Sequence, residues 1–200
     1  MTAPVRVVLA THNAHKVQEL RRILGPDLGP LELVGYDGPE PVEDGATFEE
    51  NALLKARAAA RHTGMPAIAD DSGIAVDALN GMPGVFSARW AGRHGDDLAN
   101  LRLLLAQVGD VPEEHLGAAF VCAAALVHPD GREQVFHGEM RGRLIREMRG
   151  EGGFGYDPIF VPDGHDRTSA ELSPAEKDAI SHRGKAFREL SKVIAKELLG

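Results

Sequence analysis

The feature that most constrains this 200-residue chain is its first strand, which runs directly into a helix. Val5–Ala10 reads VRVVLA, a short β-branched run typical of a buried strand. The next residues, NAHKVQELRRIL, place apolar side chains at helical spacing, and Gly25-Pro26 ends the helix. A strand that enters a helix through a polar connection is the usual start of an α/β unit. We therefore predict an α/β fold.

The rest of the chain continues this alternation. Thr47 and Glu50 form a capping-box pattern, which predicts a helix from Phe48 to about His62, ended by Gly64. The spacing of apolar residues and the turn residues predict the remaining elements. Strands are expected over 31–36 and 67–69, and an antiparallel pair of strands joined by the Pro129-Asp130-Gly131 turn is expected over 116–145. Helices are expected over 96–109, from Ser173 and over 180–199. No repeat, low-complexity tract or linker divides the sequence, so we expect one domain over residues 1–200.

Composition is that of an ordinary globular protein. A 43% hydrophobic share allows a sizeable core, and the net charge of −8 argues against nonspecific nucleic-acid binding. Cys122 is the only cysteine, which excludes a disulfide within the chain, and its apolar surroundings predict a buried core residue. No long apolar segment marks a signal peptide or membrane span, so we expect a cytoplasmic protein.

Two adjacent aspartates follow the short apolar strand over 67–69. Burying a carboxylate alone is costly, so PAIADDSG must either sit at a turn or face a cation. Because successive strand side chains point to opposite faces, Asp70 and Asp71 should not reach the same point. We expect one carboxylate in a cleft and the other bonded to backbone in a turn at Ser72-Gly73. Carboxylate oxygens of this kind suit Mg²⁺.

Two polar segments near the N-terminus can bind an anion. THNAHK joins the first strand to the first helix, where free backbone N–H groups, Thr11, Asn13 and Lys16 could receive a phosphate. The alternative is that Asn13 only caps the helix. Glu43 lies in a polar loop, where a solvated residue is the commoner case for a glutamate taken alone. Lys55 lies among apolar residues, so we expect it near the core with an anionic partner.

A glycine-rich segment, GEGGFGYDP, begins at Gly150. Its glycines match G-x-G-x-x-G, but no βαβ context precedes them and no helix follows, so we reject a dinucleotide site. The glycines would let the loop approach a flat ligand, with Phe154 as a stacking face and Asp157 as a polar contact. The alternative is a simple turn with Phe154 in the core.

Several common catalytic signatures are absent from the sequence. It contains no G-x-x-x-x-G-K-[ST], H-E-x-x-H, C-x-x-C or G-x-S-x-G. These absences argue against P-loop kinases, zinc hydrolases and serine hydrolases. The adjacent His182 and Arg183, near Lys177, carry no signal in isolation.

Taken together, the polar segments resemble the inosine/xanthosine triphosphate pyrophosphatase family. The resemblance rests on LATHNAHKVQEL, TFEENALLKARAAA, PAIADDSGIAVDALNGMPGVFSARWAG, GEGGFGYDPIF and AELSPAEKDAISHRGKA. These blocks occur in the family's order and span nearly the whole chain. His12 is a departure, because a small residue is expected there, and we expect its side chain to point away from the phosphates.

The resemblance implies a role for each matched residue. Asp71 is the base that activates water, and Glu43 and Asp71 hold the metal. Asp70 is left to bond backbone or a lysine. The phosphate contacts implied are Thr11, His12, Asn13, Ala14, His15, Lys16, Lys55, Ser72 and Lys177, and the base pocket is Phe154, Gly155, Tyr156, Asp157, His182 and Arg183. Donors from His182 and Arg183 would favour the 6-keto oxygen of hypoxanthine and xanthine over the amino group of adenine.

The resemblance also implies fold and activity. We expect an elongated α/β fold of two lobes around a long mixed β-sheet with flanking helices, and an active site in the cleft between the lobes. The expected activity is Mg²⁺-dependent hydrolysis of ITP, dITP and XTP to the monophosphate and pyrophosphate. The expected assembly is a homodimer, without a nucleic-acid or membrane partner.

Two other functions remain open from the sequence. One is a house-cleaning pyrophosphatase for other nucleotides, such as modified pyrimidines. The other is a noncatalytic nucleotide sensor, against which the set Glu43, Lys55 and Asp71 argues.

Overall fold

The computed structural model describes residues 5–25, 29 and 31–199. The chain divides into two compact units. Unit 1 comprises Met1–Asp71, Cys122–Gly138 and Arg183–Gly200, and unit 2 comprises Ser72–Val121 and Glu139–His182. We describe each unit by itself.

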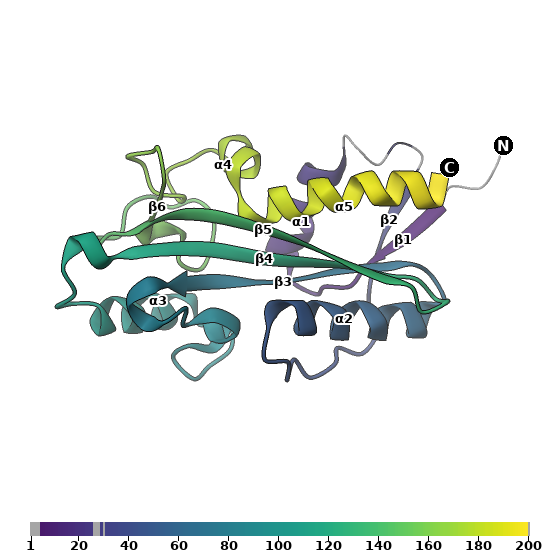
Figure 1. Ribbon diagram of the computed structural model, residues 1–200, viewed down its shortest axis with the longest axis horizontal. Helices are drawn as coiled ribbons and strands as arrows, with labels where there is room; N and C mark the ends of the chain where they lie inside the picture. The colour runs from purple at the N-terminus through teal and green to yellow at the C-terminus, as the bar shows by residue number, and fades with distance from the viewer. Residues whose placement is uncertain (1–4, 26–28, 30, 200) are drawn as a thin grey trace. The chain divides into compact units, whose positions relative to one another are not determined.

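The strands of the described residues form a six-stranded sheet in the order β2-β1-β3-β4-β5-β6 (Figure 1). β1 pairs in parallel with both β2 and β3, whereas β6 is antiparallel to β5, so the sheet is mixed. The strands are β1 (Val5–Leu9), β2 (Leu31–Gly35), β3 (Ala67–Val76), β4 (Gly117–Val127), β5 (Glu133–Leu144) and β6 (Phe160–Pro162). This architecture confirms the prediction of an α/β fold with a mixed sheet.

The predicted helices are present with nearly the predicted bounds. They are α1 (Ala14–Leu24), α2 (Phe48–Thr63), α3 (Asp97–Gln107), α4 (Pro174–Ile180) and α5 (His182–Leu199). Gly25 caps α1 as predicted, while Pro26 lies outside the described residues. Gly64 ends α2 in the left-handed conformation, with φ 68°. None of the helices in the described part of the chain is both long and apolar enough to span a bilayer.

The capping box predicted for α2 is only half formed. The Thr47 side chain accepts a hydrogen bond from the Glu50 N–H at 3.1 Å. The Glu50 carboxylate accepts from the Ala46 N–H at 2.6 Å, instead of reaching back to Thr47. At α4 both halves of the box form between Ser173 and Glu176. Local sequence therefore sets the start of both helices. At α2 the Glu50 carboxylate bonds the N–H of Ala46, one residue before the expected Thr47.

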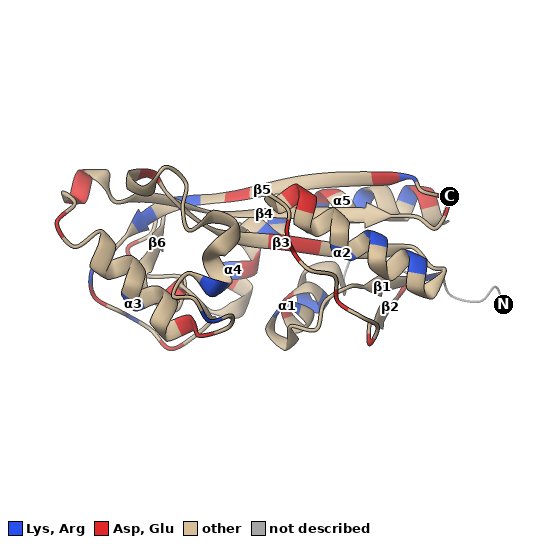
Figure 2. Ribbon diagram, turned by 90° about the horizontal axis from the view of Figure 1, so that it is seen from below, with Lys and Arg blue, Asp and Glu red and all other residues tan. Residues whose placement is uncertain are grey.

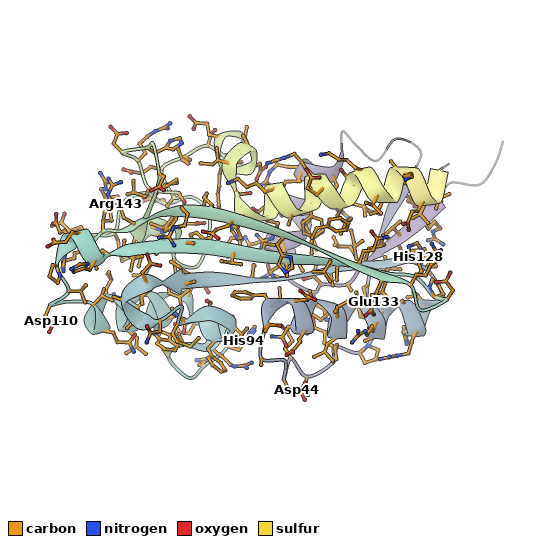
Figure 3. All side chains as sticks on the ribbon, in the orientation of Figure 1. Asp44, His94, Asp110, His128, Glu133 and Arg143 are labelled. Carbon is orange, nitrogen blue, oxygen red and sulfur yellow. The ribbon has the colours of Figure 1, made fainter. Side chains whose placement is uncertain are left out.

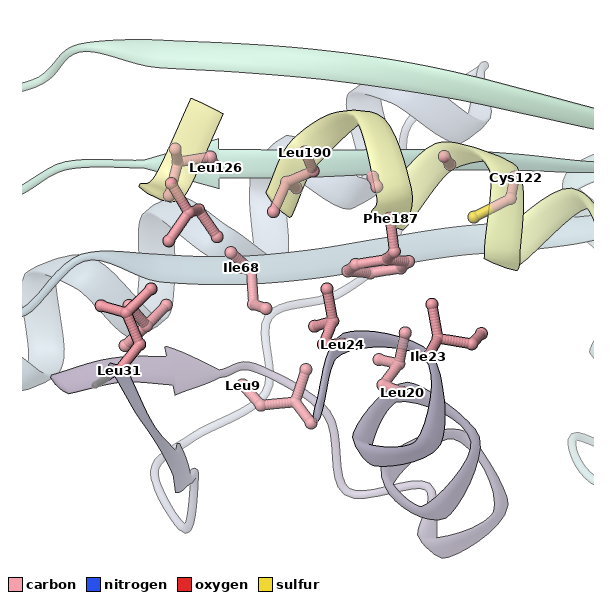
Figure 4. Close-up of a cluster of buried hydrophobic side chains, with 14 residues drawn as sticks. Leu9, Leu20, Ile23, Leu24, Leu31, Ile68, Cys122, Leu126, Phe187 and Leu190 are labelled. Atoms are coloured by element: carbon pink, nitrogen blue, oxygen red, sulfur yellow. The ribbon is translucent and has the colours of Figure 1, made fainter. Parts of the chain in front are cut away.

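The core of unit 1 has two apolar clusters on the two faces of its strands. In β3, Ile68 packs in the cluster with α1 and α5, whereas Ala67 and Ala69 pack in the cluster with α2. Figure 4 shows the first cluster, in which Phe187 of α5 lies near Ile68 and the α1 leucines. Alanine lines most of the second cluster, which lets α2 pack closely on the strands. Cys122 is a buried member of the first cluster, as predicted.

Unit 2 has its own core. Its apolar cluster joins Ile74 of β3, Leu101 and Leu104 of α3, and Phe160 of β6. Tyr156, from the glycine-rich segment, belongs to the same cluster. This segment is therefore anchored to the core of unit 2 at its C-terminal end.

The predicted turn at Ser72-Gly73 is wrong. β3 continues through both residues to Val76. Gly73 is required for close packing, because a Cβ built there would overlap the Ser87 hydroxyl oxygen. The same hydroxyl accepts a hydrogen bond from the Ile74 N–H at 2.9 Å. The glycine marks a close approach to the strand, and not its end.

The predicted turn at Pro129-Asp130-Gly131 is confirmed. The His128 N–H donates to the Arg132 carbonyl at 2.9 Å, which closes the connection between β4 and β5. His128 and Glu133 lie beside this turn (Figure 3).

Candidate active site

The aspartate doublet directs its two carboxylates to opposite faces of β3. Asp70 is on the face of α1 and α5, where it contacts Lys16 and Arg183. Asp71 is on the face of α2, where it accepts a hydrogen bond from the Asn51 side chain at 3.0 Å. Figure 2 shows this acidic segment in red on β3. The expectation that only one carboxylate serves a given site is therefore consistent with the strand geometry.

Asp70 is part of a buried ion network. The Arg183 guanidinium, only 1% exposed, donates to Asp70 Oδ2 at 3.1 Å and to Glu19 Oε2 at 2.6 Å. Lys16 Nζ lies 3.3 Å from the same Asp70 oxygen. Burial would raise the pKa of Asp70, but Lys16 and Arg183 hold this pKa well below its ordinary value. Of the two partners expected for Asp70, backbone or a lysine, the structure shows the lysine, Lys16, together with Arg183.

Asp71 is buried with weaker charge compensation. Burial is the main cause that raises the pKa of its carboxyl; Lys55 opposes this shift, and Glu43 adds to it. Lys55 Nζ lies 3.2 Å from Glu43 Oε2 and is nearly buried, as predicted for that lysine. The group Glu43, Lys55 and Asp71 therefore contains two carboxylates and one lysine, and Asp71 is its buried carboxylate. We call this group and the Asp70 network together the charged cluster of unit 1, with members Lys16, Glu19, Glu43, Lys55, Asp70, Asp71 and Arg183.

The connection from β1 to α1 is formed by helix capping. The Asn13 side-chain oxygen accepts hydrogen bonds from the N–H groups of His15 and Lys16, at 3.0 and 3.2 Å. Thr11 Oγ1 accepts from the Asn13 N–H at 3.1 Å. Asn13 therefore caps α1, and its side chain bonds N–H groups that an anion would otherwise use. Its contact with a phosphate stays a prediction. Ala14 is the first residue of α1.

His12 has partners outside the phosphate segment. Its ring stacks on Tyr36, with centroids 5.7 Å apart. Its Nδ1 lies 3.2 Å from Glu40 Oε1. These contacts explain how the segment accepts a large side chain where the family pattern has a small one.

Unit 2 carries the glycine-rich segment, which we call the aromatic loop and define as residues 150–157. Asp157, only 2% exposed, accepts hydrogen bonds from the Phe154 N–H at 2.9 Å and from Lys177 Nζ at 2.6 Å. Lys177 Nζ also lies 5.1 Å from the centre of the Phe154 ring. Phe154 is half-buried and outside the apolar cluster of unit 2, so the core alternative is wrong. Asp157 therefore holds the backbone of Phe154, and Lys177 contacts its ring.

The remaining predicted residues are distributed between the units. His182 is buried in unit 2, where it stacks on Phe120 with centroids 5.1 Å apart. Ser72 follows Asp71 along β3 and is half-buried in unit 2. Arg183 belongs to the network of unit 1, so the adjacent His182 and Arg183 have different partners. The ion pairs assign Arg183 a structural role, and its part in base recognition stays a prediction.

Two members of the site were not found from the sequence. Glu19 follows Lys16 by one helical turn, and a glutamate on the buried side of an amphipathic helix is the signal that could have found it. Asn51 is 2% exposed within the alanine-rich face of α2. A buried amide amid apolar residues requires a hydrogen-bond partner, which is Asp71.

Metal binding by protein groups alone is not supported. Within the described ranges, no three or more His, Cys, Asp and Glu side chains gather to hold an ion. Mg²⁺ commonly uses one or two carboxylates, with substrate phosphates and water completing its shell. Glu43 and Asp71 fit that smaller donor set.

The fold, the charged cluster of unit 1 and the aromatic loop of unit 2 define an α/β protein with buried lysines and carboxylates and a hydrogen-bonded aromatic loop. The Ham1 family model matches residues 7–193, and the chain belongs to this family. This result confirms the resemblance seen in the sequence.

Relatives agree with this assignment over almost the whole chain. A dITP/XTP pyrophosphatase of Leifsonia xyli is 61% identical over 190 residues, covering 95% of this chain and 96% of the relative. A dITP/XTP pyrophosphatase of Streptomyces coelicolor is 60% identical over 199 residues, covering 98% of this chain and 99% of the relative. Among solved structures, a HAM1 protein from Coxiella burnetii has a TM-score of 0.87 at 42% identity, covering 96% and 99%. The Staphylococcus aureus Ham1 protein has a TM-score of 0.84 at 39% identity, with the same coverage.

Proposed function

We propose that this protein hydrolyses deaminated purine nucleoside triphosphates (ITP, dITP and XTP) to the monophosphate and pyrophosphate. The observation that carries the proposal is the group Glu43, Lys55 and Asp71, in which a buried carboxylate of raised pKa lies beside a lysine and a second carboxylate. The names of the relatives, dITP/XTP pyrophosphatase, support the same substrate class.

Mg²⁺ is the metal that we propose for this reaction. Glu43 and Asp71 would hold it, because burial raises the pKa of the Asp71 carboxyl and a nearby cation would favour its ionised form. When bound, Mg²⁺ supplies neutralisation of phosphate charge. The donor set consists of oxygen ligands, which Mg²⁺ prefers.

The protein's own groups have distinct tasks in the reaction. Asp71 is held by Asn51 and accepts a proton from the water that attacks the α-phosphorus. Lys55 and Lys16 stabilise negative charge on the phosphates, as positioned cations do in phosphoryl transfer. Asp70 anchors Lys16, which places this cation at the start of α1.

Base recognition is proposed for the aromatic loop. Phe154 offers a stacking face, and Lys177 and Asp157 supply polar groups next to it. A donor facing purine position 6 would accept a keto oxygen and oppose the amino group of adenine. A buried polar mismatch of this kind can discriminate by roughly 10⁴-fold.

We place this activity in the cytoplasm and in a homodimer. The homodimer follows from the family resemblance, and the cytoplasm is the compartment expected for a sequence without a long apolar segment. Light scattering of the purified protein would test the dimer, and a monomeric mass would contradict it.

The test is a nucleotide panel with Mg²⁺ and identification of the products. We expect ITP, dITP and XTP to be far better substrates than ATP, dUTP and methylated pyrimidine triphosphates, with monophosphate and pyrophosphate as products. Preference for a pyrimidine would favour the alternative house-cleaning activity. Tight binding of ITP without monophosphate formation would favour a sensor.

A further inference from the structure

The aromatic loop is held by a carboxylate that lies outside its own motif. Asp97, in the first turn of α3, accepts a hydrogen bond from the Gly155 N–H through Oδ2 at 3.0 Å. The donor and acceptor are 58 residues apart in the sequence. Next to it, the Phe154 N–H donates to Asp157 Oδ2 at 2.9 Å. Two carboxylates therefore accept hydrogen bonds from the consecutive backbone N–H groups of Phe154 and Gly155.

This segment needs external anchors because of its backbone. Gly153 and Gly155 have φ of 68° and 61°, in the left-handed region that favours glycine. Glycine loses the most conformational freedom on folding, so such a loop holds one conformation only where contacts fix it. At Gly153 the surrounding atoms leave no room for a side chain, since a Cβ there would overlap Asp157 Oδ2. At Gly155 no atom lies within contact distance of an added Cβ, so its position depends on hydrogen bonding.

The anchors differ in where they act. Tyr156 donates from its hydroxyl to the Ser87 carbonyl at 2.7 Å, which fixes the C-terminal end of the loop in the core. Lys177 and Asp157 are buried and act on Phe154 itself. Asp97 is exposed and acts on the adjacent peptide. It can thus be changed without opening the core of unit 2.

We propose that Asp97 is a positioning residue, which fixes the Phe154–Gly155 peptide so that the ring is oriented in advance for purine binding. This inference rests on the proposed function, in which Phe154 stacks on the base. Orientation in advance lowers the entropy cost of binding. Loss of the Asp97 bond therefore raises KM for ITP and leaves kcat nearly unchanged, because Asp97 is not among the reacting groups.

The first experiment measures the hydrogen bond directly. Amide hydrogen exchange at Gly155, followed by NMR in the protein without nucleotide, should be faster in Asp97→Ala than in the parent protein. Asp97→Asn retains an acceptor oxygen and should restore much of the protection. Asp110→Ala is the matched control, because Asp110 is an exposed aspartate beyond the end of α3 (Figure 3). Equal Gly155 exchange in Asp97→Ala and Asp110→Ala would overturn the inference.

The second experiment measures ITP hydrolysis by the same variants. We expect KM to rise about 3- to 10-fold in Asp97→Ala, because the variant loses one hydrogen bond to a charged group at an exposed site. We expect Asp97→Asn to restore KM in part. If the carboxylate acted only by its charge at the start of α3, Asn would restore nothing, which would contradict the proposed role. Circular dichroism of each variant checks that α3 is retained.

Phe154→Ala separates this inference from the proposed function. If Phe154→Ala raises KM and Asp97→Ala does not, the positioning role of Asp97 is wrong while the purine pocket stands. If Phe154→Ala leaves KM unchanged, the proposed purine pocket is wrong, and the functional role of Asp97 is wrong with it.

Discussion

The charged cluster of unit 1 and the aromatic loop of unit 2 are built in contrasting ways. In the charged cluster, buried carboxylates and cations are held by helices and a strand, as in the contact of Arg183 with Asp70. In the aromatic loop, left-handed glycines and hydrogen bonds from the backbone to Asp97 and Asp157 hold the segment that carries the Phe154 ring. Charge on rigid elements suits phosphate chemistry, whereas an anchored loop suits recognition of a flat base.

The contrast extends to the two adjacent aspartates. Asp70 has a lowered pKa because Lys16 and Arg183 outweigh its burial, while burial leaves Asp71 with a raised pKa. One carboxylate is therefore stabilised in its ionised form by the fold, and the other carries its charge at a cost. Perturbed carboxyls of the second kind are frequent at catalytic positions.

The largest expected effect comes from the charged cluster. Asp71→Asn should lower kcat for ITP by roughly 10²- to 10⁴-fold, because it removes the proton acceptor. The folded protein should not lose stability, since a group with raised pKa is destabilising when ionised near neutral pH. Pyrophosphate release and urea unfolding at pH 7 measure the two quantities. Turnover close to that of the parent protein would exclude this role for Asp71.

Next in size is the ion network around Asp70. Arg183→Ala should lower the free energy of unfolding by about 3–5 kcal/mol, since two buried carboxylates lose their shared partner. Arg21→Ala is the matched control: Arg21 is an exposed arginine of α1, and an exposed change costs less than about 0.5 kcal/mol. Urea unfolding is the measurement. Similar stability of the two variants would show that the network is not structural.

In the aromatic loop we expect an effect on binding. Phe154→Ala should raise KM for ITP by roughly 5- to 100-fold, because base stacking on an aromatic ring contributes about 1–3 kcal/mol. Initial-rate kinetics give KM and kcat separately. A fall in kcat with unchanged KM would place Phe154 with the chemistry and remove the contrast between the two regions.

The smallest effect is expected at the start of α4, which carries Lys177. Glu176 accepts hydrogen bonds from Arg167 and from the Ser173 N–H, which lower the pKa of its carboxyl to about 2. Because its pKa is lower in the folded state, ionised Glu176 stabilises the fold at pH values above the ordinary pKa of glutamate. This contribution is lost as the pH falls through about 2. The stability difference between the parent protein and Glu176→Gln should therefore shrink on acidification. NMR titration of Glu176 measures the pKa, and an ordinary value near that of free glutamate would contradict it.

Much of the local structure followed from the sequence. The end of α2 at Gly64 was predicted, and the cap at Asn13 was weighed as an alternative, because a cap depends on residues within one helical turn. The period of a strand likewise predicted that Asp70 and Asp71 point to opposite faces. The turn at Ser72-Gly73 was wrong because Gly73 is required by Ser87, a residue that local patterns do not relate to it.

The sequence by itself determined the strand and helix order, the helix caps and the candidate residues, because these depend on neighbours along the chain. Only the tertiary structure decided their partners. Arg183 meets Asp70 and Glu19 across 113 and 164 residues of sequence, and Asp97 meets Gly155 across 58. Such contacts form where elements pack, and packing depends on the shape and burial of the whole core rather than on spacing in the chain. The same packing stabilises the charge of Asp70 and leaves that of Asp71 destabilised.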